Sequence, residues 1–267
     1  MSPFLFTIVM TTLLQDAHAK LLERLPDAPA AHFVRELVYA DDTLLLDANP
    51  DVVQELMSCV EECGKQYGLS LNWSKVEMMR VRSNAHVVNS VGEIVREKEA
   101  LVYLGTQLSS DGRCGSELSR RIGAAKQDFK VLDSIWSHAT LSRHRKVKIF
   151  KACVVSKLCY CIFAACLNKS ERKRLDGFQA RCLRKIYRIQ PSYYSRVSNS
   201  AVLSIAGERP LSEAIAKQQM VFLGKLARRP GNDPVRSSVL QPGGIELQTP
   251  TGTRKRGRPD RCGATWC

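Results

Sequence analysis

The pattern of apolar and polar positions is mixed over the first 110 residues of the chain. Residues 4–14 form an uncharged apolar run that continues into an amphipathic pattern through Leu22, which predicts one helix. Two β-prone runs follow at residues 33–39 and 42–47, and they predict a hairpin. The chain therefore begins with a helix followed by a pair of antiparallel strands.

A second helix is predicted to start at Asn49, a good N-cap residue followed by proline, and to end at Gly64 or Gly68. Its apolar residues recur at helical spacing: Val52, Val53, Leu56, Cys59, Val60 and Cys63. Short strands are then predicted as an antiparallel set over residues 76–81, 86–89 and 94–96, with a further hairpin over residues 101–108.

From Cys114 onward the apolar period becomes helical and stays so. The first of these helices carries one apolar stripe: Leu118, Ile122, Ala125, Phe129, Leu132 and Trp136. Further helices are predicted to begin at Ser142 and at Ser170, and a fourth to run from Pro210 to about Arg228. The apolar stripes are interpreted as the core of a helical bundle.

The sequence predicts an α+β segment at residues 1–110 and an all-α segment at residues 111–230. Residues 231–267 are rich in Pro and Gly and lack periodicity, which predicts a flexible basic tail. No apolar run reaches the length of a membrane span, and the first run lacks the preceding positive charge of a signal peptide. We expect no membrane partner.

Charge is divided unevenly between the two parts of the chain. Residues 1–98 carry 9 Lys and Arg against 14 Asp and Glu, whereas residues 99–267 carry 31 against 12. A concentrated positive charge of this size is typical of proteins that bind phosphate backbones. The alternative is that these cations lie on ordinary solvated helix faces. The candidate nucleic-acid-binding residues of the helices are Arg143, Arg145, Lys146, Lys148, Arg172, Lys173, Arg181, Arg184 and Lys185.

The tail adds a second basic cluster. Its candidate nucleic-acid-binding residues are Arg254, Arg256 and Arg258. Residues 256–259 are an Arg-Gly-Arg-Pro sequence like the core of an AT-hook, whose arginines enter narrow minor grooves. Asp260 replaces the basic residue expected after it, so a general basic tail is the simpler interpretation.

Ten cysteines occur without Cys-x-x-Cys pairs or a regular disulfide spacing. Cys59 and Cys63 lie one helical turn apart, but no nearby His or Cys offers the remaining ligands of a zinc site. Free thiols in a reducing compartment are the simple interpretation. We therefore expect an intracellular protein, nuclear or cytoplasmic.

The most pointed chemistry is at residues 39–42, Tyr-Ala-Asp-Asp, between the two strands of the first predicted hairpin. Adjacent carboxylates repel each other, and each raises the pKa of the other unless a cation compensates. Mg²⁺ takes carboxylate oxygens and bridges them to substrate phosphates. Asp41 and Asp42 are therefore candidate Mg²⁺ ligands, with a plain solvated turn as the alternative.

The sequence resembles non-LTR (LINE-type) retrotransposon reverse transcriptases in four blocks that follow the order of that family. Residues 1–10 are similar to the end of the block that precedes the metal-binding hairpin, and residues 39–42 match the Tyr-x-Asp-Asp hairpin itself. Residues 68–77 (Gly-Leu-Ser-Leu-Asn-Trp-Ser-Lys-Val-Glu) and 102–105 (Val-Tyr-Leu-Gly) are similar to the two blocks that follow.

The resemblance implies a partial polymerase palm at residues 1–110 and a helical thumb at residues 111–230. It implies that Asp41 and Asp42 are catalytic and bind Mg²⁺, and that Lys75 lies near the departing pyrophosphate. It implies that the segment of Tyr103, Leu104 and Gly105 supports the primer terminus. The implied partners are an RNA template and a DNA primer, while the oligomeric state stays open.

Two-metal nucleotidyl transfer needs carboxylates from two separate places. In the family, one aspartate comes from a strand upstream of the block at residues 1–10, and the fingers also lie upstream. We therefore expect negligible RNA-directed DNA synthesis by this chain alone. Two other interpretations stay open: a non-catalytic nucleic-acid-binding protein derived from such an element, and a portion of a longer reading frame.

Overall fold

The structure is a computed structural model that describes residues 3–26, 36–138 and 140–248. It divides into two compact units, Met1–Gly112 and Arg113–Cys267. The first unit combines helices with short strand pairs and the second is helical, so the predicted α+β class is confirmed. Among the described residues, no helix combines the length and the apolar character needed to cross a bilayer.

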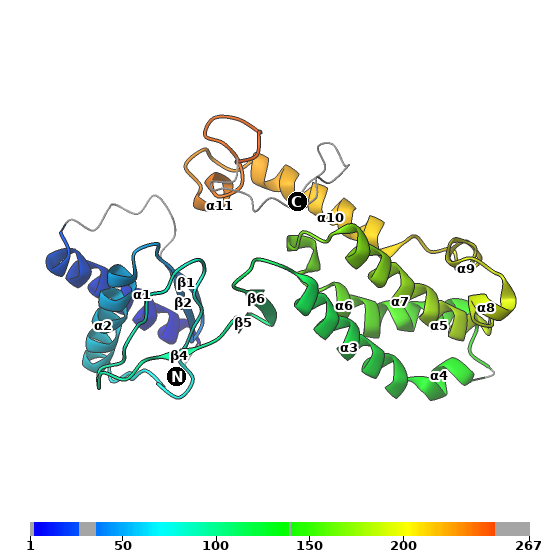
Figure 1. Ribbon diagram of the computed structural model, residues 1–267, viewed down its shortest axis with the longest axis horizontal. Coiled ribbons are helices and arrows are strands. Elements are labelled where there is room, and N and C mark those ends of the chain that lie inside the picture. The colour runs from blue at the N-terminus through cyan, green and yellow to red at the C-terminus, as the bar shows by residue number, and fades with distance from the viewer. Residues whose placement is uncertain (1–2, 27–35, 139, 249–267) are drawn as a thin grey trace. The chain divides into compact units, whose positions relative to one another are not determined.

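The first unit is built on two packed helices, α1 (Pro3–Arg24) and α2 (Pro50–Gln66) (Figure 1). The side chain of Asn49 accepts a hydrogen bond from the Asp51 N–H, and Pro50 occupies the first turn, so α2 begins as predicted. The buried side chains between the helices are Leu13, Leu14, Ala17, Leu21, Val52, Leu56, Cys59 and Cys63.

Ion pairs close the edge of this helix pair. Arg24 of α1 contacts two carboxylates of α2, Glu55 at 2.7 Å and Glu62 at 2.6 Å. Lys20 also contacts Glu62, at 2.7 Å. These groups are partly exposed, so they orient the helices while the apolar contact supplies most of the stability.

The short strands of this unit form separate pairs. The two predicted hairpins are confirmed, and their strands are β1 (Glu36–Tyr39), β2 (Asp42–Leu45), β5 (Ala100–Tyr103) and β6 (Thr106–Ser109). The prediction of an antiparallel set over residues 76–96 is wrong in part, because β3 (Glu77–Met78) pairs in parallel with β4 (Arg96–Glu97). An antiparallel bridge, Val88 to Ile94, lies between them in sequence.

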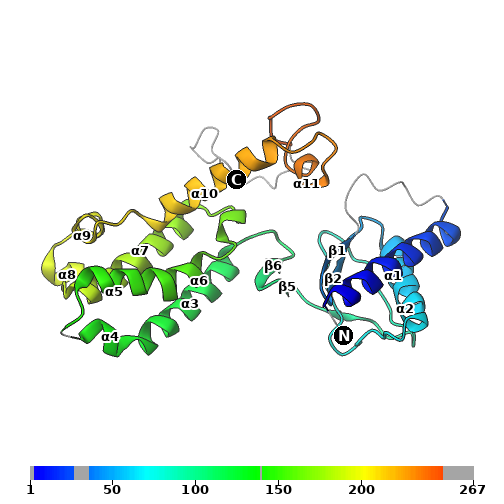
Figure 2. The same cartoon turned by 180° about the vertical axis from the view of Figure 1, so that it is seen from behind.

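The second unit is a bundle in which α3 (Gly115–Val131), α5 (Arg143–Phe150) and α7 (Lys169–Tyr187) pack together (Figure 2). Its core contains the stripe predicted from residue 118 to residue 136, although the backbone breaks at Leu132 and continues as α4 (Asp133–Ser137). After α5 the chain passes through a π-helical turn, Lys151–Val155, into α6 (Ser156–Cys159).

The start of α7 differs from the prediction by two residues. Asn168, rather than Ser170, is the N-cap residue, and the Glu171 carboxylate accepts a hydrogen bond from the Asn168 N–H at 2.8 Å. This reciprocal arrangement is a capping box with asparagine in the cap position. It satisfies amide groups at both Asn168 and Glu171, which the hydroxyl of Ser170 alone would not.

The chain after α7 continues through α8 (Ser192–Ser195), α9 (Asn199–Ala206), α10 (Leu211–Ala227) and α11 (Pro234–Ser237). The predicted flexible tail is wrong for residues 231–248, because α11 is capped by Asp233 and Arg236 is buried. Arg236 donates to the carbonyls of Ala227 at 2.7 Å and Gly244 at 2.6 Å, which ties this segment to the end of α10. Arg254, Arg256 and Arg258 lie outside the described residues.

The described cysteines are free thiols, as predicted. Burial raises the pKa of the Cys182 thiol to about 12, whereas Cys153 and Cys166 are exposed. Iodoacetamide at pH 8 should therefore modify Cys153 and Cys166 in the folded protein and leave Cys182 unmodified until denaturant is added, because the thiolate is the nucleophile. Peptide mass mapping measures this, and labelling of Cys182 at the rate of Cys153 would contradict its placement.

Candidate active site and basic surface

The predicted metal-binding residues lie at the tip of the first hairpin. Tyr39 pairs with Asp42 at the end of the ladder, so Ala40 and Asp41 form a two-residue loop. Ala40 has a positive φ of 53°, as the first loop residue of the hairpin turns favoured by strand twist requires. Asp41 and Asp42 are both exposed at this tip, with no ion pair to a described residue.

The second hairpin braces the first. The Tyr103 hydroxyl of β5 donates a hydrogen bond to the Leu37 carbonyl of β1, at 2.9 Å. Burial raises the pKa of Tyr103, and the negative charge of Asp42 raises it further, which places this hydroxyl in the field of the candidate carboxylates. The structure thus brings together Asp42 and Tyr103, two residues that the sequence separates widely.

The loop after Tyr103 has a defined geometry. Leu104 and Gly105 have φ values of 47° and 75°, the pattern of a two-residue turn in which both central residues are left-handed. Glycine adopts this conformation freely, whereas leucine is strained in it. Leu104 is exposed at this strained position, so its side chain is displayed beside the hairpin and not used in the core.

Lys75, the predicted pyrophosphate-side residue, is exposed in a turn that starts at Asn72. Its backbone N–H donates to the Asn72 carbonyl at 2.8 Å. Within the described residues, no hydrogen bond or ion pair joins it to Asp41 or Asp42. The role of Lys75 thus stays a prediction.

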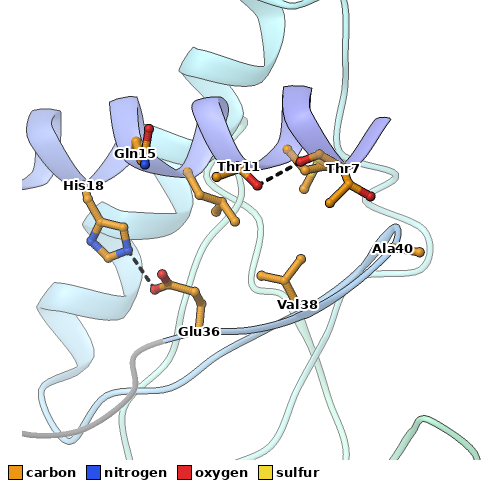
Figure 3. Close-up of a pocket in the computed structure, with 9 residues that line it drawn as sticks. Thr7, Thr11, Gln15, His18, Glu36, Val38 and Ala40 are labelled. Carbon is orange, nitrogen blue, oxygen red and sulfur yellow. Dashed lines mark hydrogen bonds and ion pairs between the residues drawn. The ribbon is translucent and has the colours of Figure 1, made fainter. Parts of the chain in front are cut away.

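A groove that sequence reasoning missed leads to the Asp41 turn. It has a volume of about 380 Å³ and lies between α1 and β1 (Figure 3). On the helix side its polar lining residues are Thr7, Thr11, Gln15 and His18, and on the strand side it is lined by Glu36, Val38 and Ala40. His18 Nε2 lies 2.7 Å from a Glu36 carboxylate oxygen and closes one end.

The sequence held a signal for this groove. Thr7, Thr11, Gln15 and His18 step by 4, 4 and 3, which places them on one face of an otherwise apolar helix. Residues 36, 38 and 40 alternate along the strand and so share one face. A polar stripe on an apolar helix indicates a face that does not pack in the core, and here that face lines the groove beside the acidic hairpin.

Asp41 and Asp42 fit Mg²⁺ by donor type, because both offer exposed, hard carboxylate oxygens. They do not form a complete set: nowhere among the described residues do three or more His, Cys, Asp or Glu side chains converge to hold a metal. Two other carboxylates of this unit have partners of their own. Asp16 accepts from the Tyr67 hydroxyl at 2.6 Å, and Glu36 contacts His18.

The basic face of the helical unit differs from the prediction at two positions. Lys146 and Arg184 are buried, at 4% and 6% exposure, so the expectation that they lie on a solvent-facing surface is wrong. Lys146 Nζ donates to the carbonyls of Trp136 at 2.8 Å and His138 at 2.7 Å, which satisfies the end of α4. Its charge is used inside the fold.

Arg184 acts as a clamp on the chain around α8. Its guanidinium donates to the carbonyls of Gln190 at 3.1 Å and Val197 at 2.6 Å, and to the Asn199 side chain at 3.2 Å. Gln190 and Val197 flank the short helix on either side. The clamp therefore fixes both ends of a surface loop to α7.

The other predicted cations of α5 and α7 are exposed, and they fall into two groups. Three of them have partners. The guanidinium of Arg143 lies 5.6 Å from the centroid of the Tyr187 ring, and Arg172 donates a hydrogen bond to the Leu167 carbonyl at 2.9 Å. Lys185 forms an ion pair with Asp133. Arg145, Lys148, Lys173 and Arg181 make no contact of these kinds within the described part of the chain. They remain available to an external anion.

Arg184→Gln should lower the free energy of unfolding by about 2–4 kcal/mol, because two carbonyls and an amide lose a charged donor inside the fold. Arg181→Gln on the same helix, with the same loss of charge, should change it by no more than about 0.5 kcal/mol, because Arg181 is exposed. Urea denaturation followed by circular dichroism measures both, and equal effects of the two substitutions would contradict the clamp.

Comparison with known proteins supports a resemblance to reverse transcriptases over the first unit, without specifying the type. The family model for reverse transcriptase (RNA-dependent DNA polymerase) matches residues 1–108. No curated protein and no solved structure shows significant similarity to the chain. The four sequence blocks, the Asp-Asp hairpin and the Tyr103 brace all fall within the matched segment, so residues 1–108 are similar to a reverse transcriptase domain.

Proposed function

We propose that this chain is part of an RNA-directed DNA polymerase of the non-LTR retrotransposon type, with residues 1–110 as the rear of the palm and residues 111–230 as the thumb. The observation that carries the proposal is the exposed Asp41–Asp42 pair on a hairpin that Tyr103 braces, inside the segment similar to reverse transcriptases. The proposed substrates are a DNA primer on an RNA template and an incoming nucleotide.

Each part of the palm has a proposed role. Asp41 and Asp42 would hold Mg²⁺, which when bound neutralises phosphate charge at the reacting centre. Tyr103 fixes the second hairpin to the first, and the exposed turn of Leu104 and Gly105 would support the primer terminus. Lys75, exposed and without an acidic partner in the described residues, is a candidate cation for the departing pyrophosphate.

The carboxylate pair is proposed to be an incomplete catalytic set. Two-metal transfer needs a third carboxylate from another strand to hold both ions. Among the described residues, Asp16 and Glu36 are already bonded to Tyr67 and His18, and no third acidic side chain joins the pair. We therefore propose that the chain by itself does not sustain DNA synthesis.

The helical unit is proposed to contact the phosphates of the template–primer duplex. Arg145 and Lys148 on α5, with Lys173 and Arg181 on α7, are exposed and lack acidic partners in the described residues. Cations of this kind bind phosphates by releasing counterions, without reading sequence. Lys146 and Arg184 are not part of the proposed surface, because both are buried.

Mn²⁺, a probe for the Mg²⁺ site, should bind the full chain weakly, and Asp41→Asn or Asp42→Asn should abolish this binding. Asp51→Asn, an exposed aspartate of α2, is the matched control and should retain it. Electron paramagnetic resonance of free Mn²⁺ gives the readout without requiring activity. Equal binding by the Asp41→Asn and Asp51→Asn variants would argue against the hairpin as the metal site.

The same preparations should show no primer extension on an RNA template with Mg²⁺ and deoxynucleotides. Extension that Asp41→Asn abolishes would contradict the proposed incompleteness and establish a working site in this chain. Binding of nucleic acid that is indifferent to Mg²⁺ and to Asp41→Asn would favour a non-catalytic binding protein.

Duplex binding by the helical unit should depend steeply on salt. Replacing Arg145 and Lys148 together by Gln should lower the slope of log K against log salt by about 0.9 for each phosphate that the variant no longer neutralises. Lys217→Gln with Lys225→Gln on α10 removes the same charge and should leave the slope unchanged. Fluorescence anisotropy with an RNA–DNA duplex measures both, and equal slopes in the two double variants would refute the proposed face.

A further inference from the structure

We propose that the chain around α8 is a binding platform for an unpaired nucleotide, with an aromatic surface for its base and a cationic pocket for its phosphate. The inference rests on the nucleic-acid binding that we propose for the helical unit, and it adds a second mode to it. Duplex contact through phosphates does not require aromatic side chains, whereas the platform does.

The aromatic surface consists of Tyr193 and Tyr194. Both rings are 74% exposed, and they contact each other edge to face with centroids 5.2 Å apart. The guanidinium of Arg196 lies 5.8 Å from the Tyr193 centroid. An exposed aromatic pair beside a cation suits a nucleic-acid base, because every base has a face that stacks on an aromatic ring.

A cationic pocket adjoins this pair. It has a volume of about 520 Å³, and its lining includes Arg181 and Lys185 of α7, Ser192 of α8 and Asn199 of α9. Ser192 directly precedes Tyr193, so the pocket and the aromatic surface share one short segment. A phosphate in the pocket would lie next to a base on the tyrosines.

Arg181 is the available cation of the pocket. Lys185 already forms an ion pair with Asp133, whereas no described acidic residue pairs with Arg181. Gly177 lies one turn earlier on α7, and a methyl group there would lie 3.6 Å from Arg181 Nη1, an ordinary contact distance. The guanidinium thus lies across the surface of the glycine, beside the pocket.

The platform is held in place before any ligand arrives. Arg184 binds Gln190 and Val197 on either side of α8, and the Ser195 hydroxyl donates to the Gln190 carbonyl at 3.0 Å. These bonds fix the loop that carries the tyrosines, so little conformational entropy remains to be lost on binding. A recognition surface requires side chains that are both fixed in place and exposed, and the loop around α8 provides them.

The observations favour an unpaired strand over a duplex. In a duplex the faces of the bases are covered by their neighbours, and only phosphates and groove edges are accessible. A free strand can place a base on Tyr193 while its phosphate meets Arg181. Such stacking is tolerant of sequence, so RNA and DNA strands share the chemistry and the test includes both.

The test compares affinities of the full chain for single strands of about ten nucleotides, oligodeoxythymidylate and oligouridylate, with its affinity for an RNA–DNA duplex. Tyr193→Ala with Tyr194→Ala should weaken single-strand binding about tenfold or more, without changing the salt slope or the duplex affinity. The double Phe variant keeps the rings and should restore wild-type affinity.

Arg181→Gln should weaken single-strand binding and reduce its salt slope by about 0.7, the value for one phosphate on a single strand. Arg228→Gln, an exposed arginine at the end of α10, is the charge-matched control and should leave the slope unchanged. Circular dichroism of every variant confirms that the fold is kept.

The outcomes separate this inference from the function proposed above. If the wild-type chain binds duplex and the double Ala variant binds single strands as tightly as wild type, the platform is overturned while duplex binding stands. If the Phe variant is as weak as the Ala variant, stacking is overturned as the cause. If the wild-type chain binds neither nucleic acid, both proposals fail.

Discussion

Short helices impose the main constraint on the second unit, because each helix end leaves carbonyl groups that need a donor. Buried cations of the described chain supply much of this need: Arg121, Lys146, Arg184 and Arg236. Each donates to a main-chain carbonyl in the segment after a helix or at its end, and the recipients include Lys157, Trp136, Gln190 and Ala227. Without them the turns between helices would bury unsatisfied polar groups, at a cost of about 1–3 kcal/mol each.

The sequence predicts the local features of this fold, but it does not predict which cations are buried. Helix positions and hairpins were predictable because apolar periodicity and caps such as Asn49 act locally. Whether a cation is buried depends on which carbonyl lies near it in three dimensions. Lys146 nevertheless left a trace in the sequence, because it lies four residues before Phe150 and therefore on the apolar face of its helix.

The strand pairing and the groove illustrate two other limits. Residues 77–78 and 96–97 pair in parallel because of the path of the intervening chain, which residue composition does not specify. The Tyr103–Leu37 hydrogen bond joins positions 66 residues apart, so no local pattern predicts it. The polar stripe of Thr7, Thr11 and His18 was visible in the sequence, but its partner strand could be identified only from the structure.

The tip of the first hairpin combines a strained backbone with two adjacent negative charges, and the fold does not need either feature. Ala40 adopts a positive φ that glycine would adopt without strain, at a cost of about 1–2 kcal/mol for an L-residue. Asp41 and Asp42 add a repulsion between like charges, whereas Glu55 and Glu62 of the same unit are neutralised by Arg24. A tight turn would be better made by Asn-Gly. Tyr103 holds this exposed tip, where backbone strain coincides with like charges that no described cation pairs. This combination is consistent with a carboxylate site whose compensating charge comes from a bound ligand.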